Sequence, residues 1–141
     1  MIVKDVMNRN VIVGKPDVTL KEASKVMSQY HIGSLVVVEK EKIVGIITER
    51  NVLKSVAQGK NPELTTVEDI MSKNVITIEP DKKIDEAVEL MMKHKIKKLP
   101  VVSNKKLVGI VTCSDISVVE PKLIQSIASL ISLKLPGYRG G

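Results

Sequence analysis

The chain has very few aromatic residues and a single cysteine, and each scarcity excludes a class of function. Its 141 residues include two tyrosines, Tyr30 and Tyr138, and no tryptophan or phenylalanine. Aromatic side chains are the usual platforms on which exposed bases stack, so binding of single-stranded nucleic acid is poorly supported. The lone Cys113 excludes an internal disulfide and a cysteine-based zinc site.

Long hydrophobic runs are absent as well. No segment approaches the ~18 apolar residues of a membrane span, and residues 1–10 lack the apolar stretch of a signal peptide. We therefore expect a cytoplasmic protein that does not associate with a membrane. With 43% hydrophobic residues, the chain can bury a sizeable core. The net charge of +6 is compatible with an anionic small molecule, a nucleic acid or no partner.

The sequence contains an internal repeat. Residues 3–53 realign with residues 67–117 at a constant offset of 64 positions and without a gap. Identical pairs include Asp5/Asp69, Met7/Met71, Pro16/Pro80, Asp17/Asp81, Glu22/Glu86, Gly45/Gly109 and Thr48/Thr112. Two similar units, each too small for a robust core, are expected to pack on each other. Packing about a pseudo-twofold axis would create paired clefts between them.

Each repeat predicts the same order of elements. A brief extended run (residues 11–13 and 75–77) precedes a helix, because apolar residues recur at helical spacing from Leu20 and from Ile84. Two β-branched runs predict paired strands at residues 35–38 and 43–47, and again at 99–102 and 107–111. A second helix is expected to follow each pair.

A polar linker at residues 58–66 separates the copies. It predicts domains at residues 1–60 and 61–135, followed by a flexible tail at residues 136–141. An apolar stripe at residues 121–135 predicts an additional helix.

The repeated polar motif is Gly-x-x-Thr-x-x-Asn/Asp, at residues 45–51 and 109–115. It is expected where a strand runs into the first turn of a helix, where exposed amides can hold an anion. The threonine hydroxyl can donate to a phosphate oxygen, and Asp115 can accept from both hydroxyls of a ribose, whereas the uncharged Asn51 would accept more weakly. Alternatively, these residues are ordinary helix N-caps. The two interpretations are compatible.

Three groups of residues carry a resemblance to a known family. They are VKDVMNRNVIV, HIGSLVVV and IVGIITERN, with the counterparts VEDIMSKNVIT, HKIKKLPVV and LVGIVTCSD in the second copy. The sequence resembles a tandem pair of CBS domains, or Bateman module, over about residues 1–133. The resemblance implies an α/β (α+β) fold of two pseudo-twofold-related β-α-β-β-α repeats packed through their sheets. In this family the clefts between repeats bind adenosyl compounds.

Each implied cleft combines residues of both repeats. The first would use Val13, Gly33, Ser34 and Val36 around the base, with Thr112, Ser114 and Asp115 on the ribose and phosphate. The second would use Thr77, Lys97, Lys98 and Pro100 near the base, with Thr48, Arg50 and Asn51 opposite. The family's aspartate is replaced by Asn51 in the second cleft, where Arg50 and the nearby lysines favour phosphate instead.

The resulting hypothesis is a regulatory module that senses an adenine nucleotide such as AMP, ADP or ATP and needs no obligatory cofactor. The family resemblance and the apolar helices suggest a homodimer, whose output would pass to a separate effector protein. The alternative is nucleic-acid binding through basic residues such as the run at residues 93–98, which is otherwise a solvated surface. We expect neither catalytic nor metal-binding residues, because no nucleophile–base pair, carboxylate pair or ligand set recurs at useful spacing.

Overall fold

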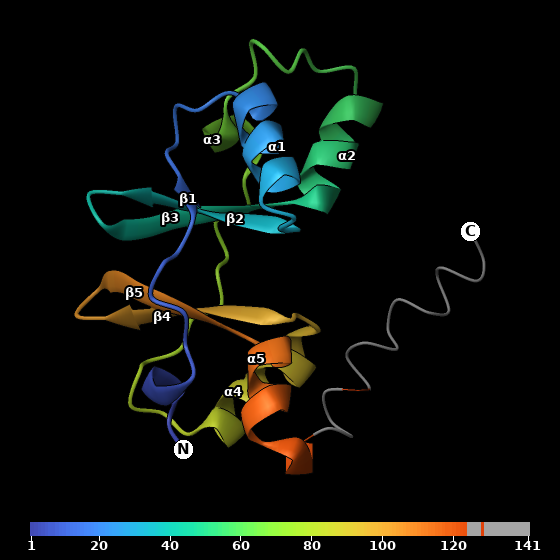
Figure 1. Cartoon of the computed structure of the whole chain (residues 1–141). Coiled ribbons are helices and arrows are strands. Elements are labelled where there is room, and N and C mark those ends of the chain that lie inside the picture. The colour runs from blue at the N-terminus through green and yellow to red at the C-terminus, as the bar shows by residue number, and fades with distance from the viewer. Residues whose placement is uncertain (124–127, 129–141) are drawn as a thin grey trace. The chain divides into compact units, whose positions relative to one another are not determined.

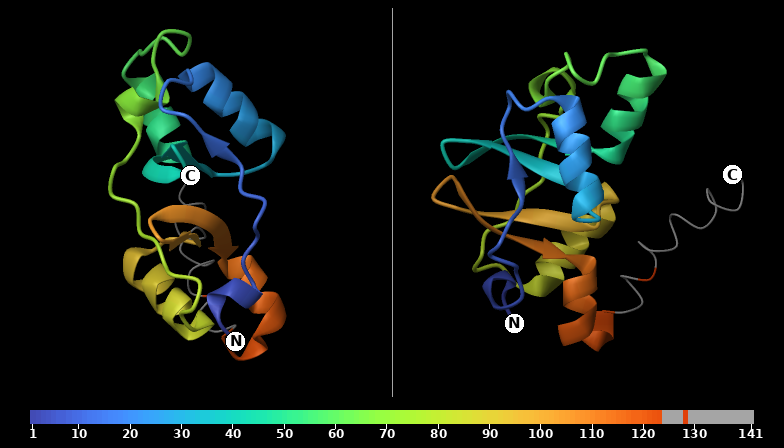
Figure 2. Two further views of the ribbon diagram at one scale, coloured as in Figure 1. Left: turned by 90° about the vertical axis from the view of Figure 1, so that its left-hand side faces the viewer. Right: turned by 45° about the horizontal axis from the view of Figure 1, so that its top comes forward.

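The computed structural model describes residues 1–123 and residue 128. They form two compact units, called here the first unit (residues 12–75) and the second unit (residues 1–11 and residues from 76 onward). Each unit has its own sheet and its own hydrophobic core. In each, the helices lie on one face of the sheet (Figures 1 and 2). The predicted mixed α and β fold is confirmed. Within the described residues, no helix is long and apolar enough to cross a membrane.

The first unit contains β1 (Val13–Gly14), α1 (Leu20–Gln29), β2 (Ser34–Glu39), β3 (Lys42–Thr48), α2 (Glu49–Ala57) and α3 (Val67–Ile70). β2 pairs with β1 in parallel and with β3 in antiparallel orientation. Helix α1 begins where predicted, because Thr19 caps it: its hydroxyl accepts a hydrogen bond from the Glu22 amide at 3.2 Å. Its apolar residues face the core, so the predicted helix is confirmed.

The second unit contains η1 (Val3–Asp5), α4 (Ile84–His94), β4 (Lys98–Ser103), β5 (Lys106–Thr112), α5 (Cys113–Val119) and η2 (Pro121–Leu123). β4 and β5 form an antiparallel pair, as predicted. The extended run predicted at residues 75–77 forms no strand; pairing is limited to a single bridge between Ile78 and Val101. Of the helix predicted at residues 121–135, the structure describes only η2 and residue 128. The tail predicted at residues 136–141 lies outside the described residues.

Each unit incorporates the leading segment of the other sequence repeat. Val3, from the start of the first repeat, is fully buried in the core of the second unit, where its amide donates to the Lys82 carbonyl at 2.8 Å. Val67, its equivalent, is fully buried in the core of the first unit, and its amide donates to the Val18 carbonyl at 2.8 Å. The compact units therefore differ from the linear repeats, whose limits at residues 60 and 135 stay a prediction.

The motif glycines allow these leading segments to approach the sheets. A Cβ atom on Gly45 would lie 2.5 Å from the Met71 sulfur and 2.9 Å from the Ser72 carbonyl oxygen. On Gly109 it would lie 2.7 Å from the Met7 sulfur. All three distances are too short for a Cβ atom, so a larger residue would have to displace the methionine side chain and, at Gly45, also the Ser72 backbone. The glycine of the motif is therefore required by packing.

Candidate functional site

Both Thr-x-x-Asn/Asp segments lie at strand-to-helix junctions, as predicted. Thr48 caps α2, and its hydroxyl accepts from the Asn51 amide at 3.2 Å. Thr112 caps α5 in the same way, accepting from the Asp115 amide at 3.1 Å. The N-cap interpretation is thus confirmed at both positions. The side chains of Asn51 and Asp115, which end the two motifs, are both half-buried, and their contribution beyond the cap is a separate question.

The side chains of Asn51 and Asp115 differ in how they are engaged. The Asn51 amide oxygen accepts from the Thr48 backbone amide at 2.8 Å and from the Thr48 hydroxyl at 2.9 Å. Among the described residues, neither the amide nor the hydroxyl of Thr112 donates to the Asp115 carboxylate. Asp115 therefore keeps its acceptor capacity, and its charge, for an external donor.

The first unit brings several of the predicted residues together. Ser34 lies directly opposite Thr48 across the β2–β3 ladder. The Gly33 carbonyl accepts from the Glu49 amide at 3.1 Å, which holds the start of β2 against the start of α2. Arg50 is exposed on the first turn of that helix. This end of the first unit's sheet therefore brings together the polar residues that the sequence predicts for the site in that unit.

The predicted apolar contacts of the first unit lie further along the same sheet. Val13 of β1 is paired with Val36 of β2. Val13 is 39% exposed, whereas Val36 is 2% exposed. Of these two, Val13 therefore offers side-chain surface to a ligand, and Val36 belongs to the core.

The second unit repeats this arrangement with basic residues. Lys98 lies opposite Thr112 across the β4–β5 ladder, and the Lys97 carbonyl accepts from the Cys113 amide at 2.9 Å. Both lysines are half-buried, while Ser114 is exposed on the first turn of α5. Pro100 is buried, and its carbonyl accepts from the Ile78 amide at 3.1 Å.

Within one unit, then, Gly33 and Ser34 meet residues 48–51, and Lys97 and Lys98 meet residues 112–115. The expected clefts combine these sets across the two repeats, and that combination stays a prediction. The described residues contain no group of three or more histidine, cysteine or acidic side chains that could hold a metal ion.

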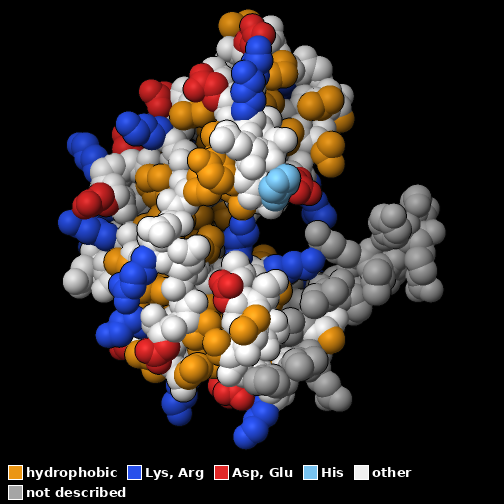
Figure 3. Space-filling view, in the orientation of Figure 1, with side chains coloured by type: hydrophobic (Ala, Val, Ile, Leu, Met, Phe, Trp, Pro, Cys, Tyr) orange, Lys and Arg blue, Asp and Glu red, His pale blue; other side chains and the backbone are white. Residues whose placement is uncertain are grey.

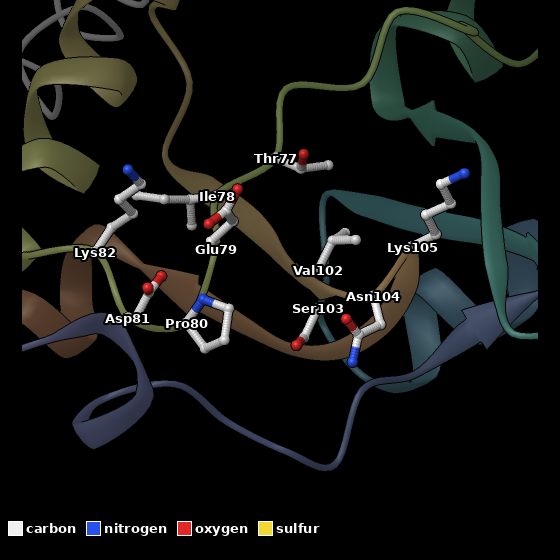
Figure 4. A pocket seen from close by; sticks show the side chains of 10 residues that line it. All are labelled: Thr77, Ile78, Glu79, Pro80, Asp81, Lys82, Val102, Ser103, Asn104 and Lys105. Carbon is white, nitrogen blue, oxygen red and sulfur yellow. The ribbon is translucent and has the colours of Figure 1, made fainter.

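Thr77 lines a cavity of about 750 Å³ in the second unit, which sequence reasoning missed (Figure 4). It lies between the loop before α4 and the β4–β5 turn, and its lining residues are Thr77, Ile78, Glu79, Pro80, Asp81, Lys82, Val102, Ser103, Asn104 and Lys105. Figure 4 shows Lys82 and Lys105 at opposite ends, with Glu79 between them. The recurrence of Pro80-Asp81 as Pro16-Asp17 was the available sequence signal.

The first unit has a cavity of about 710 Å³ at the equivalent place, lined by Val13, Lys15, Pro16, Asp17, Val38, Glu39, Lys40, Glu41 and Glu68. The two cavities differ in charge. The cavity of the second unit contains two carboxylates and two lysines, whereas that of the first unit contains four carboxylates and two lysines. An anionic ligand is therefore repelled less by the cavity of the second unit than by the cavity of the first unit.

Beside α2, a small cavity of about 170 Å³ includes Asn51 and Asp69 among its lining residues. The backbone amide of Thr66, which donates to the Asp69 carboxylate at 3.1 Å, and the Thr66 hydroxyl hold the pKa of Asp69 below its ordinary value. Asp69 lies in the first turn of α3 and accepts from the amide of the N-cap residue Thr66, so its charge stabilises the segment that the first unit takes from the second repeat.

A protein-family comparison matches the CBS domain model to residues 3–58 and again to residues 67–120. This chain belongs to the CBS domain family. The predicted resemblance to a tandem CBS pair is therefore confirmed over nearly the whole described chain.

The CBS pair has similar relatives among curated proteins. An uncharacterised protein of Methanopyrus kandleri is 49% identical over 128 residues, which cover 89% of this chain and 65% of that protein. The CBS domain-containing protein YhcV of Bacillus subtilis is 36% identical over 117 residues, 82% of this chain and 83% of YhcV. The L-aspartate semialdehyde sulfurtransferase of Methanocaldococcus jannaschii is 37% identical over 118 residues, but the chain spans 22% of its length.

Among solved structures, the CBS domain pair of protein MJ0100, crystallised in complex with 5′-methylthioadenosine and S-adenosyl-L-methionine, is 36% identical. The match covers 84% of this chain and 94% of that chain, with a TM-score of 0.75.

Proposed function

We propose that this CBS pair is a regulatory module that binds an adenosyl ligand, with the Asp115 carboxylate as the acceptor for the ribose hydroxyls. Family membership and the adenosyl compounds bound by the MJ0100 pair support the ligand class. Within that class we favour an adenine nucleotide, AMP, ADP or ATP.

The observation that carries the proposal is the difference between Asp115 and Asn51. A ribose offers two donors, and a carboxylate with unused acceptor capacity can receive both. The Asn51 oxygen already accepts two hydrogen bonds from Thr48. A ligand on α2 would have to displace them or use Arg50 through its phosphates. We therefore infer one tighter site per chain, which includes Asp115.

Around Asp115 we assign Thr112 and Ser114 to the ribose and phosphate, and Val13, Gly33 and Ser34 to the base. Thr77, Lys97, Lys98 and Arg50 would form the weaker, phosphate-dominated site. Ligand binding is proposed to change self-association of the chain in the cytoplasm and its contact with a separate effector protein. No catalytic step is assigned to the pair.

Isothermal titration calorimetry with AMP, ATP, S-adenosylmethionine and 5′-methylthioadenosine tests this function. We expect one tight site per chain for at least one of the four. The 2′-deoxy form of that ligand should bind about tenfold more weakly, because it loses one hydrogen bond to a charged acceptor. Uridine monophosphate is the matched control and should not bind.

Failure of all four ligands to bind would overturn the proposal. Equal affinity for the ribose and 2′-deoxy ligands would overturn the role of Asp115. Salt-sensitive retention of single-stranded RNA, without adenosyl binding, would favour the nucleic-acid alternative instead.

A further inference from the structure

The cavity of about 750 Å³ that is lined by residues 77–82 and 102–105, called here the turn cavity, lies at the end of the β4–β5 pair that is remote from Asp115. In that pair Lys98 lies opposite Thr112 at one end, and Ser103 lies opposite Lys106 at the other. The five residue steps from Lys98 to Ser103 span about 17 Å, at roughly 3.4 Å per residue of an antiparallel strand. The turn cavity is therefore separate from the Thr-x-x-Asp end of the second unit.

The walls of the turn cavity combine carbon surface with charged groups. Its apolar lining includes the buried Ile78 and the half-buried Pro80. Lys82 and Lys105 lie at opposite ends, with Glu79 between them (Figure 4). Within the described residues, none of the charged side chains that line the cavity is held in an ion pair. Cavities of about 300–1,000 Å³ with apolar walls and a few polar groups are typical of small-molecule sites.

Lys105 occupies a strained backbone position. The two-residue turn between β4 and β5 consists of Asn104, with a φ of 51°, and Lys105, with a φ of 65°. Turns of this kind favour Asn-Gly, because a Cβ atom is crowded at positive φ. Asn104 follows this preference and Lys105 does not. The chain therefore keeps a charged side chain beside the cavity where glycine would relieve strain, and retained strain of this kind is typical of functional sites.

The equivalent cavity of the first unit lacks both lysines. Glu41 stands at the position of Lys105, and Val18 at the position of Lys82. The loop and turn of the second unit, residues 79–83 and 102–106, contain four lysines and two carboxylates, whereas the equivalent residues 15–19 and 38–42 contain three of each. Figure 3 shows exposed basic side chains on the surface of the second unit, with acidic side chains among them. An anionic ligand is therefore favoured in the turn cavity.

We propose that the turn cavity binds a phosphorylated sugar with a phosphate at each end. Lys82 and Lys105 attract the phosphates as point charges, and the Glu79 carboxylate between them accepts hydrogen bonds from sugar hydroxyls. The carbon surface of Ile78 and Pro80 faces the carbon skeleton of the sugar. A phosphate ion alone would leave Glu79 without a donor, so the presence of both charge signs favours a sugar phosphate over a simple anion. The inference goes beyond adenosyl binding and does not depend on it.

Nuclear magnetic resonance titration of the ¹⁵N-labelled chain with fructose 1,6-bisphosphate, with and without AMP, tests the site. We expect saturable amide shifts at residues 77–82 and 102–105, and none at the equivalent residues 13–18 and 38–41. Lys105→Gly and Lys82→Gln should each weaken binding about fivefold, because each removes one exposed charge interaction. Lys105→Gly relieves a positive φ, so weaker binding cannot be due to unfolding, which a thermal melt checks. Lys40→Gly is the matched control, a lysine at a φ of 52° in the β2–β3 turn, and should leave the affinity unchanged.

The ligand series separates sugar recognition from attraction of phosphate alone. Fructose 6-phosphate should bind about fivefold more weakly than the bisphosphate, and inorganic phosphate more weakly still. Inorganic phosphate that binds as tightly as the bisphosphate overturns sugar recognition. Absence of saturable shifts, shifts confined to residues 112–115, or unchanged affinity in both lysine variants overturns the site. None of these results bears on adenosyl binding, which the calorimetric titrations decide.

Discussion

Replacing Val3 by alanine should destabilise the second unit, although Val3 belongs to the first repeat in sequence. Its side chain is fully buried in the core that contains Ile84, Leu99 and Val101. Removing two methyl groups costs about 1.6 kcal/mol at ~0.8 kcal/mol each, and an incompletely relaxed cavity adds to this. We expect a loss of about 2 kcal/mol in the free energy of unfolding, measured by urea denaturation.

The location of the effect is the sharper readout. Amide chemical shifts in V3A should change at residues 78–84 and 99–101, whereas V67A should change shifts near Val18, Leu20 and Leu35 of the first unit. Lys4→Ala, at an exposed neighbouring position, should have little effect on stability. Shift changes of V3A confined to residues 12–58 would refute the exchange of leading segments.

Three further predictions concern the backbone and the caps. Lys105→Gly should stabilise the chain by about 0.5 kcal/mol in thermal denaturation, because its φ of 65° suits glycine; destabilisation would contradict the assigned turn. Gly45→Ala should lower the melting temperature more than Gly59→Ala, because a Cβ on Gly45 would overlap Met71 and the Ser72 carbonyl, whereas alanine at Gly59 meets only the strain of a φ of 73°, about 1–2 kcal/mol; equal effects would contradict the packing role. The pKa of Asp69 is lower in the folded state, so its stabilisation is present above its unfolded pKa and lost as the pH falls through the folded value. Asp69→Asn should therefore flatten the decline of stability in acid, and an unchanged slope would argue against it.

Sequence periodicity sufficed for most of the elements. Residues spaced like Leu20, Ala23 and Met27 share one face when the segment is a helix, and the four-residue links between the β-branched runs favour antiparallel pairing of the two runs that each link joins. The exchange of leading segments could not be predicted, because Val3 and Val67 are identical and either core would accept either residue. Which core each valine enters depends on the path of the whole chain, and no local sequence pattern specifies that path.

The sequence predicts which residues form the candidate site, and their role stays a prediction; their geometry was predicted only in part. The motif correctly placed Thr48 and Thr112 at helix starts. The motif attributed the weaker hydrogen-bond acceptance expected of Asn51 to its missing charge. The structure adds that the Asn51 side-chain oxygen already accepts two hydrogen bonds from Thr48. The cavity beside Thr77 depends on a loop and a turn that are distant in sequence, so Lys105 carried no signal by itself.

The central claim is that Asp115 accepts the ribose of an adenosyl ligand. The most direct test is the calorimetric dissociation constant of the best-binding ligand for Asp115→Asn, a substitution that keeps the shape and N-terminal position in α5 but removes the charge. We predict at least about tenfold weaker binding, since a hydrogen bond to a charged group contributes roughly 1.5–3 kcal/mol. Glu63→Gln, which removes an exposed carboxylate elsewhere, should bind like the unaltered chain. Affinity of Asp115→Asn within twofold of the unaltered chain would contradict the assignment.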